Sequence, residues 1–217
     1  MFCNMGKNCN ICPRKCGADR TKTTGFCKMP DALYVARAAL HFWEEPCISG
    51  TNGSGTVFFS GCNLRCVYCQ NRDIAHKNFG KKISADRLCD IFLDLQRKNA
   101  HNINLVTPTH YAFNIREALL KAKSKGFVIP VVYNTSGYEN TETLNAIADV
   151  TDIFMTDFKY WLSKSADKYS KAPDYPEVVK SAIDTMVNLQ PDLIFDDDGI
   201  LQKRSNCAYN AFAGICI

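Results

Sequence analysis

The stretch TVFFSGCNLRCVYCQN, from Thr56 to Asn71, joins a short apolar run to a loop with three cysteines. The run TVFFS has the composition of a buried strand. Cys62, Cys66 and Cys69 follow it, with three and then two residues between them. An iron–sulfur cube has four irons, and each is normally held by its own cysteine thiolate. Three thiolates therefore leave one iron open to a small molecule, much as a catalytic zinc keeps one position open.

The alternative interpretation of this loop is a zinc knuckle or three unrelated thiols. A knuckle needs a fourth ligand, for which His76 is the nearby candidate. Structural zinc sites usually combine two close pairs of ligands, and this spacing does not supply them. The placement of the loop directly after a strand therefore favours the cluster.

The composition is that of an ordinary globular chain. Of the 217 residues, 46% are hydrophobic and 22% are charged, which suits one sizeable domain or one domain with a small module. The net charge of +4 is mild, and no run of Lys and Arg occurs, so nucleic acid and membrane surfaces are not expected partners. The sequence has neither an apolar stretch that could span a bilayer nor a secretory signal, and we expect a cytoplasmic protein.

Twelve cysteines are many for a chain expected in the cytosol, where disulfides are disfavoured and clustered cysteines more often hold metal. A second group of four precedes the three-cysteine loop. Four thiolates complete either a tetrahedral zinc site or a second [4Fe–4S] cluster, and the sequence does not separate the two. The basic residues nearby would offset part of the thiolate charge. The group consists of Cys9, Cys12, Cys16 and Cys27, and the basic residues are Arg14, Lys15 and Arg20.

Strands and helices are expected to alternate after a glycine-rich loop at residues 49–55. Residues 31–40, before that loop, have apolar residues at helical spacing and are predicted to form a helix. Four successive strand–helix units imply an α/β fold with a parallel sheet and right-handed crossovers. In barrels of this kind function lies at the carboxyl ends of the strands, where the three-cysteine loop falls. The expected strands are 56–60, 102–106, 128–134 and 152–158, and the expected helices are 84–98, 114–126, 140–150 and 176–190.

The segment CNLRCVYC, from Cys62 to Cys69, resembles the signature of the radical S-adenosylmethionine (radical SAM) enzymes, including an aromatic residue, Tyr68, before the last cysteine. The resemblance implies a [4Fe–4S] cluster whose open iron is chelated by the amino and carboxylate groups of S-adenosylmethionine. It also implies reductive cleavage to methionine and a 5′-deoxyadenosyl radical that abstracts a hydrogen atom. Tyr68 would then lie beside the adenine.

A wider resemblance, from about residue 9 to residue 203, is to a branch of these enzymes related to the pyruvate formate-lyase activating enzymes. It implies a partial (β/α)6 radical SAM barrel, with about four β/α units present, and a cysteine-rich N-terminal segment. It also implies an electron donor such as a flavodoxin or ferredoxin, and a glycyl-radical protein as the first candidate partner. In order, the segments that carry it are CNICPRKCGADR, GFCKMP, HFWEEPCISGTNGSGTVFFSGCNLRCVYCQN, TPTHY, NTSGY and TDFKYW.

The resemblance points to residues after the second and third strands as contacts of S-adenosylmethionine. A glycine-glycine-glutamate segment of the family is replaced here by TPTH, in which Thr107, Thr109 and His110 are candidates by position. His110 is equally well explained as a loop histidine with its hydrogen bonds satisfied. Asn134 and Ser136 lie in the segment NTSGY, which resembles one that approaches the cofactor. Asn134 stands where the activating enzymes have an aspartate, which puts their monovalent-cation site in doubt.

Asp157 and Lys159 follow the fourth strand. They are two residues apart and therefore share one face of an extended strand. A lysine at this place could pair with the methionine carboxylate as a mobile point charge. The alternative is a surface ion pair, which is the usual role of isolated charges. The strand-end position favours the functional role.

Three segments are expected along the chain: a cysteine-rich segment at 1–46, the partial barrel at 47–203, and an aberrant tail at 204–217. A complete partial barrel of this family has six strand–helix units, and we count four. The tail shows little alternation of apolar and polar residues. One nucleotide sequence that encodes it would, in the reading frame shifted by one base, encode an apolar strand that ends in a turn. We therefore expect a frameshifted tail and a sheet with an exposed edge after its fourth strand.

Three functional hypotheses follow. The first is a radical SAM enzyme that generates a glycyl radical on a partner protein. The second is a radical SAM oxidoreductase that modifies another peptide or a small molecule. The third is an inactive, truncated metal-binding fragment. Hydrogen abstraction itself needs no acid or base from the protein, so no catalytic side chain beyond the cluster ligands is identified.

Overall fold

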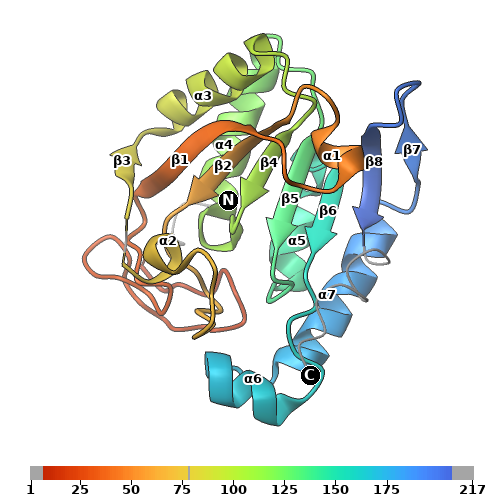
Figure 1. The fold of residues 1–217 in the computed structure, drawn as a ribbon. Helices are drawn as coiled ribbons and strands as arrows, with labels where there is room; N and C mark the ends of the chain where they lie inside the picture. Colours follow the sequence, from red (N-terminus) through yellow and green to blue (C-terminus); the bar gives the residue numbers. More distant parts are fainter. Residues whose placement is uncertain (1–6, 78, 207–217) are drawn as a thin grey trace.

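A computed structural model describes residues 7–77 and 79–206 of the chain. Cys3, Cys207 and Cys216 lie outside the described residues. The sheet has the strand order β3-β1-β2-β4-β5-β6-β8-β7, and the strands from β2 to β8 in this order pair in parallel (Figure 1). The parallel strands are β2 (Ser54–Phe59), β4 (Ile103–Val106), β5 (Val131–Thr135), β6 (Ile153–Thr156) and β8 (Leu201–Asn206).

A helix follows each of the first four parallel strands, which confirms the four predicted strand–helix units. Alternate strand residues such as Ile103 and Leu105 are buried in one core with apolar residues of these helices. The helix after β2 begins at the predicted cap, Ser84, whose hydroxyl accepts a hydrogen bond from the amide of Arg87 at 3.1 Å. The four helices are α3 (Ala85–Arg97), α4 (Ala112–Ser124), α5 (Thr141–Ile147) and α7 (Tyr175–Leu189).

The opposite face of the sheet, which we call the concave face, is also largely buried. Ile48 of the short helix α1 (Pro46–Ser49) packs there against Val132, Ile153 and Met155, which alternate with the outward-facing residues of β5 and β6. Figure 1 shows α1 on this face and α3, α4 and α5 on the other. A parallel sheet with helices α3, α4 and α5 on one face, and strands and helices alternating along the chain, is consistent with a partial β/α barrel.

The predicted helix at 31–40 is wrong, because these residues form the strand β1 (Leu33–His41). This strand pairs antiparallel with β2, from Val35 opposite Phe59 to His41 opposite Ser54, and also with β3 (Lys81–Ile83). The alanines at 36, 38 and 39 suit a helix, but Leu33 and Val35 enter the main core with the period of two that a strand requires. Pairing with β2 therefore overrides local propensity.

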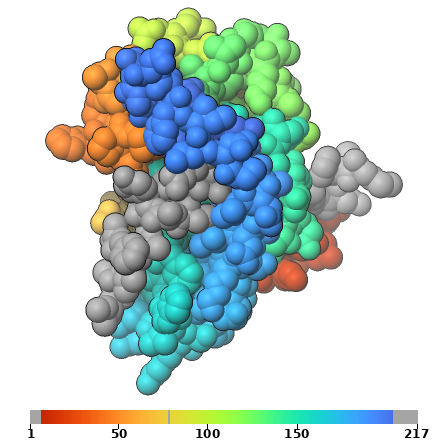
Figure 2. Space-filling model, turned by 90° about the vertical axis from the view of Figure 1, so that its right-hand side faces the viewer, coloured from red at the N-terminus to blue at the C-terminus, as the bar shows by residue number. Residues whose placement is uncertain are grey.

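The expected open edge after the fourth strand is also wrong. β8 adds a fifth parallel strand beside β6, and β7 (Ile194–Phe195) pairs antiparallel with β8. Figure 2 shows this hairpin and α7 as neighbouring blue parts of one face. Residues 204–206 of the predicted tail thus belong to β8 by their backbone, and residues 207–217 lie outside the described part. The segment boundaries at residues 46 and 203 stay predictions.

Short elements complete the architecture. Among the residues that the structure describes, no helix combines the length and apolar character needed to cross a membrane. The remaining elements are α2 (Arg72–His76), the 3₁₀ helices η1 (Thr109–Tyr111) and η2 (Ala148–Val150), and α6 (Ser163–Ser170).

Candidate functional site

The three-cysteine loop begins at Cys62, three residues beyond the carboxyl end of β2. Cys66 is buried, and Cys62 and Cys69 are partly buried. The amides of Leu64 and Arg65 point at the sulfur of Cys62, with N···Sγ distances of 3.4 and 3.5 Å. Such amide donors stabilise a ligand sulfur that carries negative charge, so this arrangement fits a cysteine-bound cluster.

Burial favours the protonated form of the cysteines in this loop when no metal is bound. It raises the pKa of Cys62 to about 11, although the amides of Arg65 and Leu64 act in the opposite direction. Burial also raises the pKa of Cys69, and the nearby ammonium of Lys159 opposes that rise. Since metal ligands must be thiolates, cluster binding at neutral pH has to release these protons.

Arg14 ties the N-terminal segment to the three-cysteine loop. Its guanidinium donates to the carbonyl oxygens of Asn63 and Leu64, within the loop, at 2.8 and 3.3 Å. It also donates to the carbonyls of Ser170, at 2.7 Å, and Lys171, at the carboxyl end of α6. One cation thus satisfies carbonyls from two segments that are far apart in sequence, and its charge is favourable at a helix carboxyl end.

Gly61 brings the two cysteine groups into contact. Its φ of 82° lies in the left-handed region. A Cβ at this position would lie 2.8 Å from the carbonyl oxygen of Cys27 and 2.2 Å from Cγ of Met29. Only glycine therefore lets the residue before Cys62 pack directly against the segment that holds Cys27 (Figure 1, where the red N-terminal segment adjoins α2).

Of the four N-terminal cysteines, Cys16 and Cys27 lie beside Gly25, Cys9 contacts Cys16, and Cys12 lies near enough to Cys9 and Cys27 to feel their charge. Cys9, Cys12 and Cys27 are buried, and Cys16 is exposed. The side chains of Cys9 and Cys16 are hydrogen-bonded, and a Cβ on Gly25 would lie 3.3 Å from Sγ of Cys16 and 3.5 Å from Sγ of Cys27. The structure thus brings these predicted ligands together in one small region.

Arg20 is buried beside this group. Its Nη1 lies 3.9 Å from Sγ of Cys9 and 2.8 Å from the carbonyl oxygen of His110, and its Nη2 lies 2.7 Å from the carbonyl oxygen of Pro30. Cys9 and Cys27 are the acidic groups that stabilise its charge most. Buried cations are normally paired, so thiolate sulfur at these two positions is the anion that fits here.

Neither cysteine group forms a preassembled site for a single ion. In the ranges 7–77 and 79–206, no three side chains of the His, Cys, Asp and Glu types surround one point as the ligands of one metal ion. In a four-iron cluster each thiolate holds its own iron, so the ligands stand farther apart than those of one ion. The cluster is therefore assigned from the identity and spacing of the cysteines and from the amides directed at Cys62, not from a preformed metal site.

The predicted cofactor contacts fall into two sets. The first set lies partly exposed at the carboxyl edge of the sheet, as expected. Lys159 forms an ion pair with Asp157 and approaches Cys69, and the amide of Thr107 donates to the carbonyl of Asn134 at 3.0 Å. The members of this set are Tyr68, Thr107, Asn134, Ser136, Asp157 and Lys159.

Thr109 and His110 form the second set and are buried. Nε2 of His110 lies 2.7 Å from the carbonyl oxygen of Ser60, just before the cysteine loop, and Nδ1 has no hydrogen-bond partner. Burial, with the nearby charge of Arg20, lowers the pKa of His110 to about 3, so the ring is neutral and donates to Ser60. The hydroxyl of Thr109 donates to Glu139 at 2.5 Å. Both side chains thus support the layer beneath the loop.

Glu139 is a buried acid that the sequence reasoning missed. Its carboxylate accepts hydrogen bonds from the hydroxyls of Thr109 and Thr135, at the ends of β4 and β5. Burial raises its pKa to about 7, and the hydroxyl donors reduce the rise. The signal that would have found it is a lone acidic residue directly after the strand-end segment NTSGY.

Tyrosines line one side of the three-cysteine loop, and the sequence analysis did not predict those other than Tyr68. Tyr68, half exposed, lies 6.0 Å from Tyr160 and 6.1 Å from Tyr169 between ring centroids. The hydroxyl of Tyr160 is hydrogen-bonded to Cys66 and lies 2.6 Å from the hydroxyl of Ser170. The aromatic residues of TDFKYW and of α6 therefore wall the loop on the side of Tyr68.

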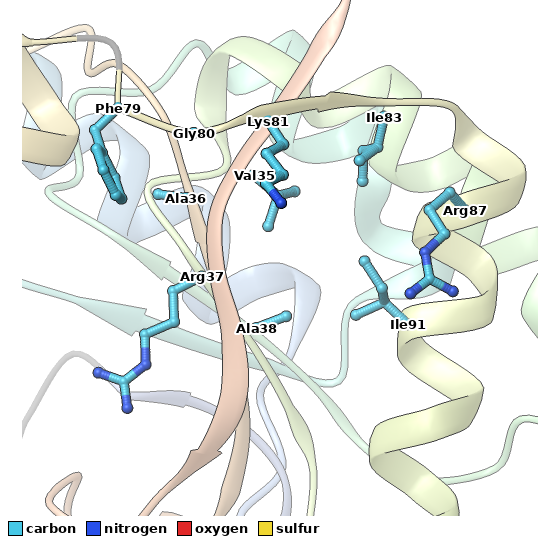
Figure 3. A pocket seen from close by; sticks show the side chains of 10 residues that line it. All are labelled: Val35, Ala36, Arg37, Ala38, Phe79, Gly80, Lys81, Ile83, Arg87 and Ile91. Atoms are coloured by element: carbon cyan, nitrogen blue, oxygen red, sulfur yellow. The ribbon is translucent and has the colours of Figure 1, made fainter.

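A surface pocket of about 620 Å³ lies elsewhere, between β1, β3 and α3. Figure 3 shows Lys81 and Arg87 beside the apolar side chains of Ile83 and Ile91. No predicted site residue lines this pocket. It is therefore separate from the three-cysteine loop and the cofactor contacts.

Known proteins resemble this chain in the region of the three-cysteine loop. The family model described as the Radical SAM superfamily matches residues 56–195, which is more than half of the chain. An uncharacterized protein of Methanocaldococcus jannaschii is 31% identical over 186 residues, covering 82% of this chain and 53% of that protein. The chain thus spans about half the length of the curated relative it matches. The family match contains the three-cysteine loop and the strand ends beside it.

Replacement of Arg14 is expected to loosen the three-cysteine loop. In Arg14→Ala the carbonyls of Asn63 and Leu64 lose a charged donor, a contact worth about 1.5–3 kcal/mol when buried. Hydrogen exchange of the loop amides should accelerate about tenfold or more, and Arg14→Lys should restore only part of the protection. Arg116→Ala, which removes a largely exposed ion pair with Asp149, is the matched control. Unchanged loop exchange in Arg14→Ala would contradict the assigned role.

Glu139 is expected to make the protein less stable as pH rises. Its folded pKa of about 7 lies above its ordinary value of 4.5, so its contribution is complete below pH 4.5 and is lost as pH rises through 7. Between pH 5 and 8 the free energy of unfolding of the wild type should fall by roughly 2 kcal/mol relative to Glu139→Gln. Denaturant unfolding of both proteins across this range measures the difference. A difference that does not change with pH would refute the assignment.

Proposed function

The chain belongs to the radical SAM superfamily, whose members bind a [4Fe–4S] cluster and S-adenosylmethionine, and from this premise we propose that it cleaves S-adenosylmethionine reductively. The observation that carries the proposal is the three-cysteine loop at the carboxyl end of β2, with two amides directed at Sγ of Cys62. The donor set leaves room for a ligand that the protein does not supply.

The three cysteines would hold three irons of the cluster, and the fourth position would take the amino and carboxylate groups of S-adenosylmethionine. When bound, the cluster supplies the electron that releases methionine and the 5′-deoxyadenosyl radical, which abstracts hydrogen. The protein's part is to hold the loop, exclude water and position the cofactor. Arg14 and Gly61 serve the first task, and the tyrosine wall around Tyr68 serves the second.

Lys159 is the proposed partner of the methionine carboxylate. It approaches Cys69, and its ammonium is held by Asp157 in the absence of another anion. A lysine can leave one carboxylate for another because its charge is compact and its stem flexible. Tyr68 would lie along the adenine. Thr107, Asn134 and Ser136 would contact the rest of the molecule from the neighbouring strand ends.

As the substrate we propose first a glycyl-radical partner protein, supported by the ordered resemblance of six segments to the activating enzymes. Another peptide or a small molecule is the competing substrate. The electron would come from a flavodoxin or ferredoxin. A purified glycyl-radical enzyme incubated with the loaded protein would show the radical by electron paramagnetic resonance, and a signal absent despite S-adenosylmethionine cleavage would favour the competing substrate.

The N-terminal cysteines are proposed as a second metal site. The support is the gathering of Cys9, Cys16 and Cys27 around Gly25 and the buried Arg20, whose charge calls for anionic sulfur. The site adjoins the three-cysteine loop through Gly61. A second cluster there would be placed to pass electrons, and a zinc ion would fasten a segment that has little core of its own.

Loss of one loop cysteine is expected to abolish the reaction. After anaerobic reconstitution with iron and sulfide, Cys66→Ala should release no 5′-deoxyadenosine above background, because the two thiolates that remain are too few to hold the four-iron cluster. Cys89→Ala is the matched control, since Cys89 is buried in α3 away from the loop. Chromatography of the products with and without dithionite measures release. Retained release in Cys66→Ala would overturn the assignment of the cluster.

Metal analysis distinguishes the two occupants of the N-terminal group. The wild type should bind about eight irons if that group holds a cluster, or about four irons and one zinc if it holds zinc. Cys12→Ala should lose the corresponding metal and keep the metal of the three-cysteine loop. A metal content that is identical in Cys12→Ala and wild type would exclude a metal site at these cysteines.

A further inference from the structure

The concave face of the sheet carries polar side chains that the proposed function does not use. Ile103 and Leu105 of β4 are buried in the core with α3 and α4. Because successive strand residues face opposite ways, Asn102 and Asn104 must point to the concave face. Both asparagines are fully buried.

The two asparagines differ in their hydrogen bonding. Oδ1 of Asn102 accepts from the hydroxyl of Ser54 at 2.6 Å, and its Nδ2 donates to the carbonyl of Ile48 at 2.7 Å. Asn104, two residues nearer the carboxyl end of β4, contacts the carboxyl of Glu44, but neither its Nδ2 nor its Oδ1 forms a hydrogen bond of normal geometry. Leaving a buried amide unsatisfied costs about 1–3 kcal/mol, so a buried amide without a well-formed hydrogen bond at this place calls for a ligand.

Glu44 stands beside this amide. Its backbone amide donates to the hydroxyl of Ser49 at 3.0 Å, which ties the residue to α1. Burial raises the pKa of its carboxyl to about 7, the charges of Glu45 and Asp157 raise it further, and the side chain of Asn104, which hydrogen-bonds to this carboxyl, opposes the rise. Asp157 has Lys159 as its ion-pair partner, whereas Glu44 forms no ion pair within the described residues.

We propose that Glu44 and Asn104 bind a cationic nitrogen group of the substrate, an ammonium or a guanidinium. Such a group would donate to the Glu44 carboxylate and to Oδ1 of Asn104, while Nδ2 of Asn104 donates to the Glu44 carboxylate. The ligand is cationic because the charges of Glu45 and Asp157 act on the Glu44 carboxyl, and Lys159 forms its ion pair with Asp157 rather than with Glu44.

The position of the site fits a substrate. Asp157 is shared between the two regions, since it neighbours Glu44 and pairs with Lys159, which approaches Cys69. A substrate anchored at Glu44 and Asn104 would therefore extend toward the three-cysteine loop. The inference rests on the proposed function only in calling the ligand a substrate, because binding of the cation does not depend on the cluster.

The test is direct binding of small probes to the full-length chain. n-Butylammonium, n-butylguanidinium and the neutral 1-butanol are titrated by ligand-observed NMR at constant ionic strength in sodium chloride. At least one cationic probe should bind saturably, whereas 1-butanol should not. The substitution Glu44→Gln should lower the affinity for the cationic probe by about tenfold or more. Glu142→Gln, in the exposed first turn of α5, is the matched control and should bind as the wild type does.

The outcomes separate this inference from the proposed function. Equal binding to wild type and Glu44→Gln, or equal binding of 1-butanol, would overturn the inference. Displacement of the probe by S-adenosylmethionine would assign the site to the cofactor and overturn it as well. If Glu44→Gln does not fold, the wild type provides the test. The NMR signal of the Glu44 carboxyl carbon should shift as the cationic probe is added, and a signal that does not shift would overturn the inference. Probe binding without release of 5′-deoxyadenosine would refute the proposed function alone.

Discussion

The guanidinium of Arg14 is the interaction on which the arrangement of the site depends. It lies between Cys12 and Cys16 in sequence, yet it donates to carbonyls of Asn63 and Leu64 in the three-cysteine loop and to carbonyls at the end of α6. The Phe26 ring lies 3.8 Å from its central carbon. Because a charged donor to several carbonyls is costly to remove, the two cysteine groups and α6 behave as one unit. The close approach of Gly61 to Cys27 completes that unit.

The sheet divides the remaining polar groups by face. On the helix side, Glu139 and His110 are buried beneath the loop. Glu139 accepts from the hydroxyls of Thr109, after β4, and Thr135, at the end of β5, and His110 contacts the carbonyl of Ser60, directly after β2. On the concave side, the Asn104 amide lacks a hydrogen bond of normal geometry, and the Glu44 carboxyl has no ion-pair partner among the described residues. Satisfied polar groups stabilise a fold, and unsatisfied ones mark where a ligand completes it. The two faces therefore have different tasks, one supporting the loop and the other facing what the loop acts on.

Much of this architecture could be predicted from local pattern. The four strand–helix units and the place of the cysteine loop follow from apolar periodicity and from the rule that parallel strands present their carboxyl ends together. β1 was predicted wrongly because Leu33, Ala36, Ala39 and Leu40 recur at helical spacing, whereas pairing with β2 decides the outcome. The role of Arg14 was out of reach for another reason. The contacts of Arg14 span 49 to 157 positions of sequence, and no local signal reports which distant carbonyls a side chain will meet.

The central claim is that the three-cysteine loop holds a cluster with one iron open to S-adenosylmethionine. Electron–nuclear double resonance of the reduced, reconstituted protein with S-adenosylmethionine labelled by ¹⁵N at its amino group tests it most directly. The account predicts a ¹⁵N hyperfine coupling that requires direct bonding to iron and that disappears in Cys66→Ala. A reduced cluster that is present in full amount and shows no coupling to the labelled nitrogen would contradict it.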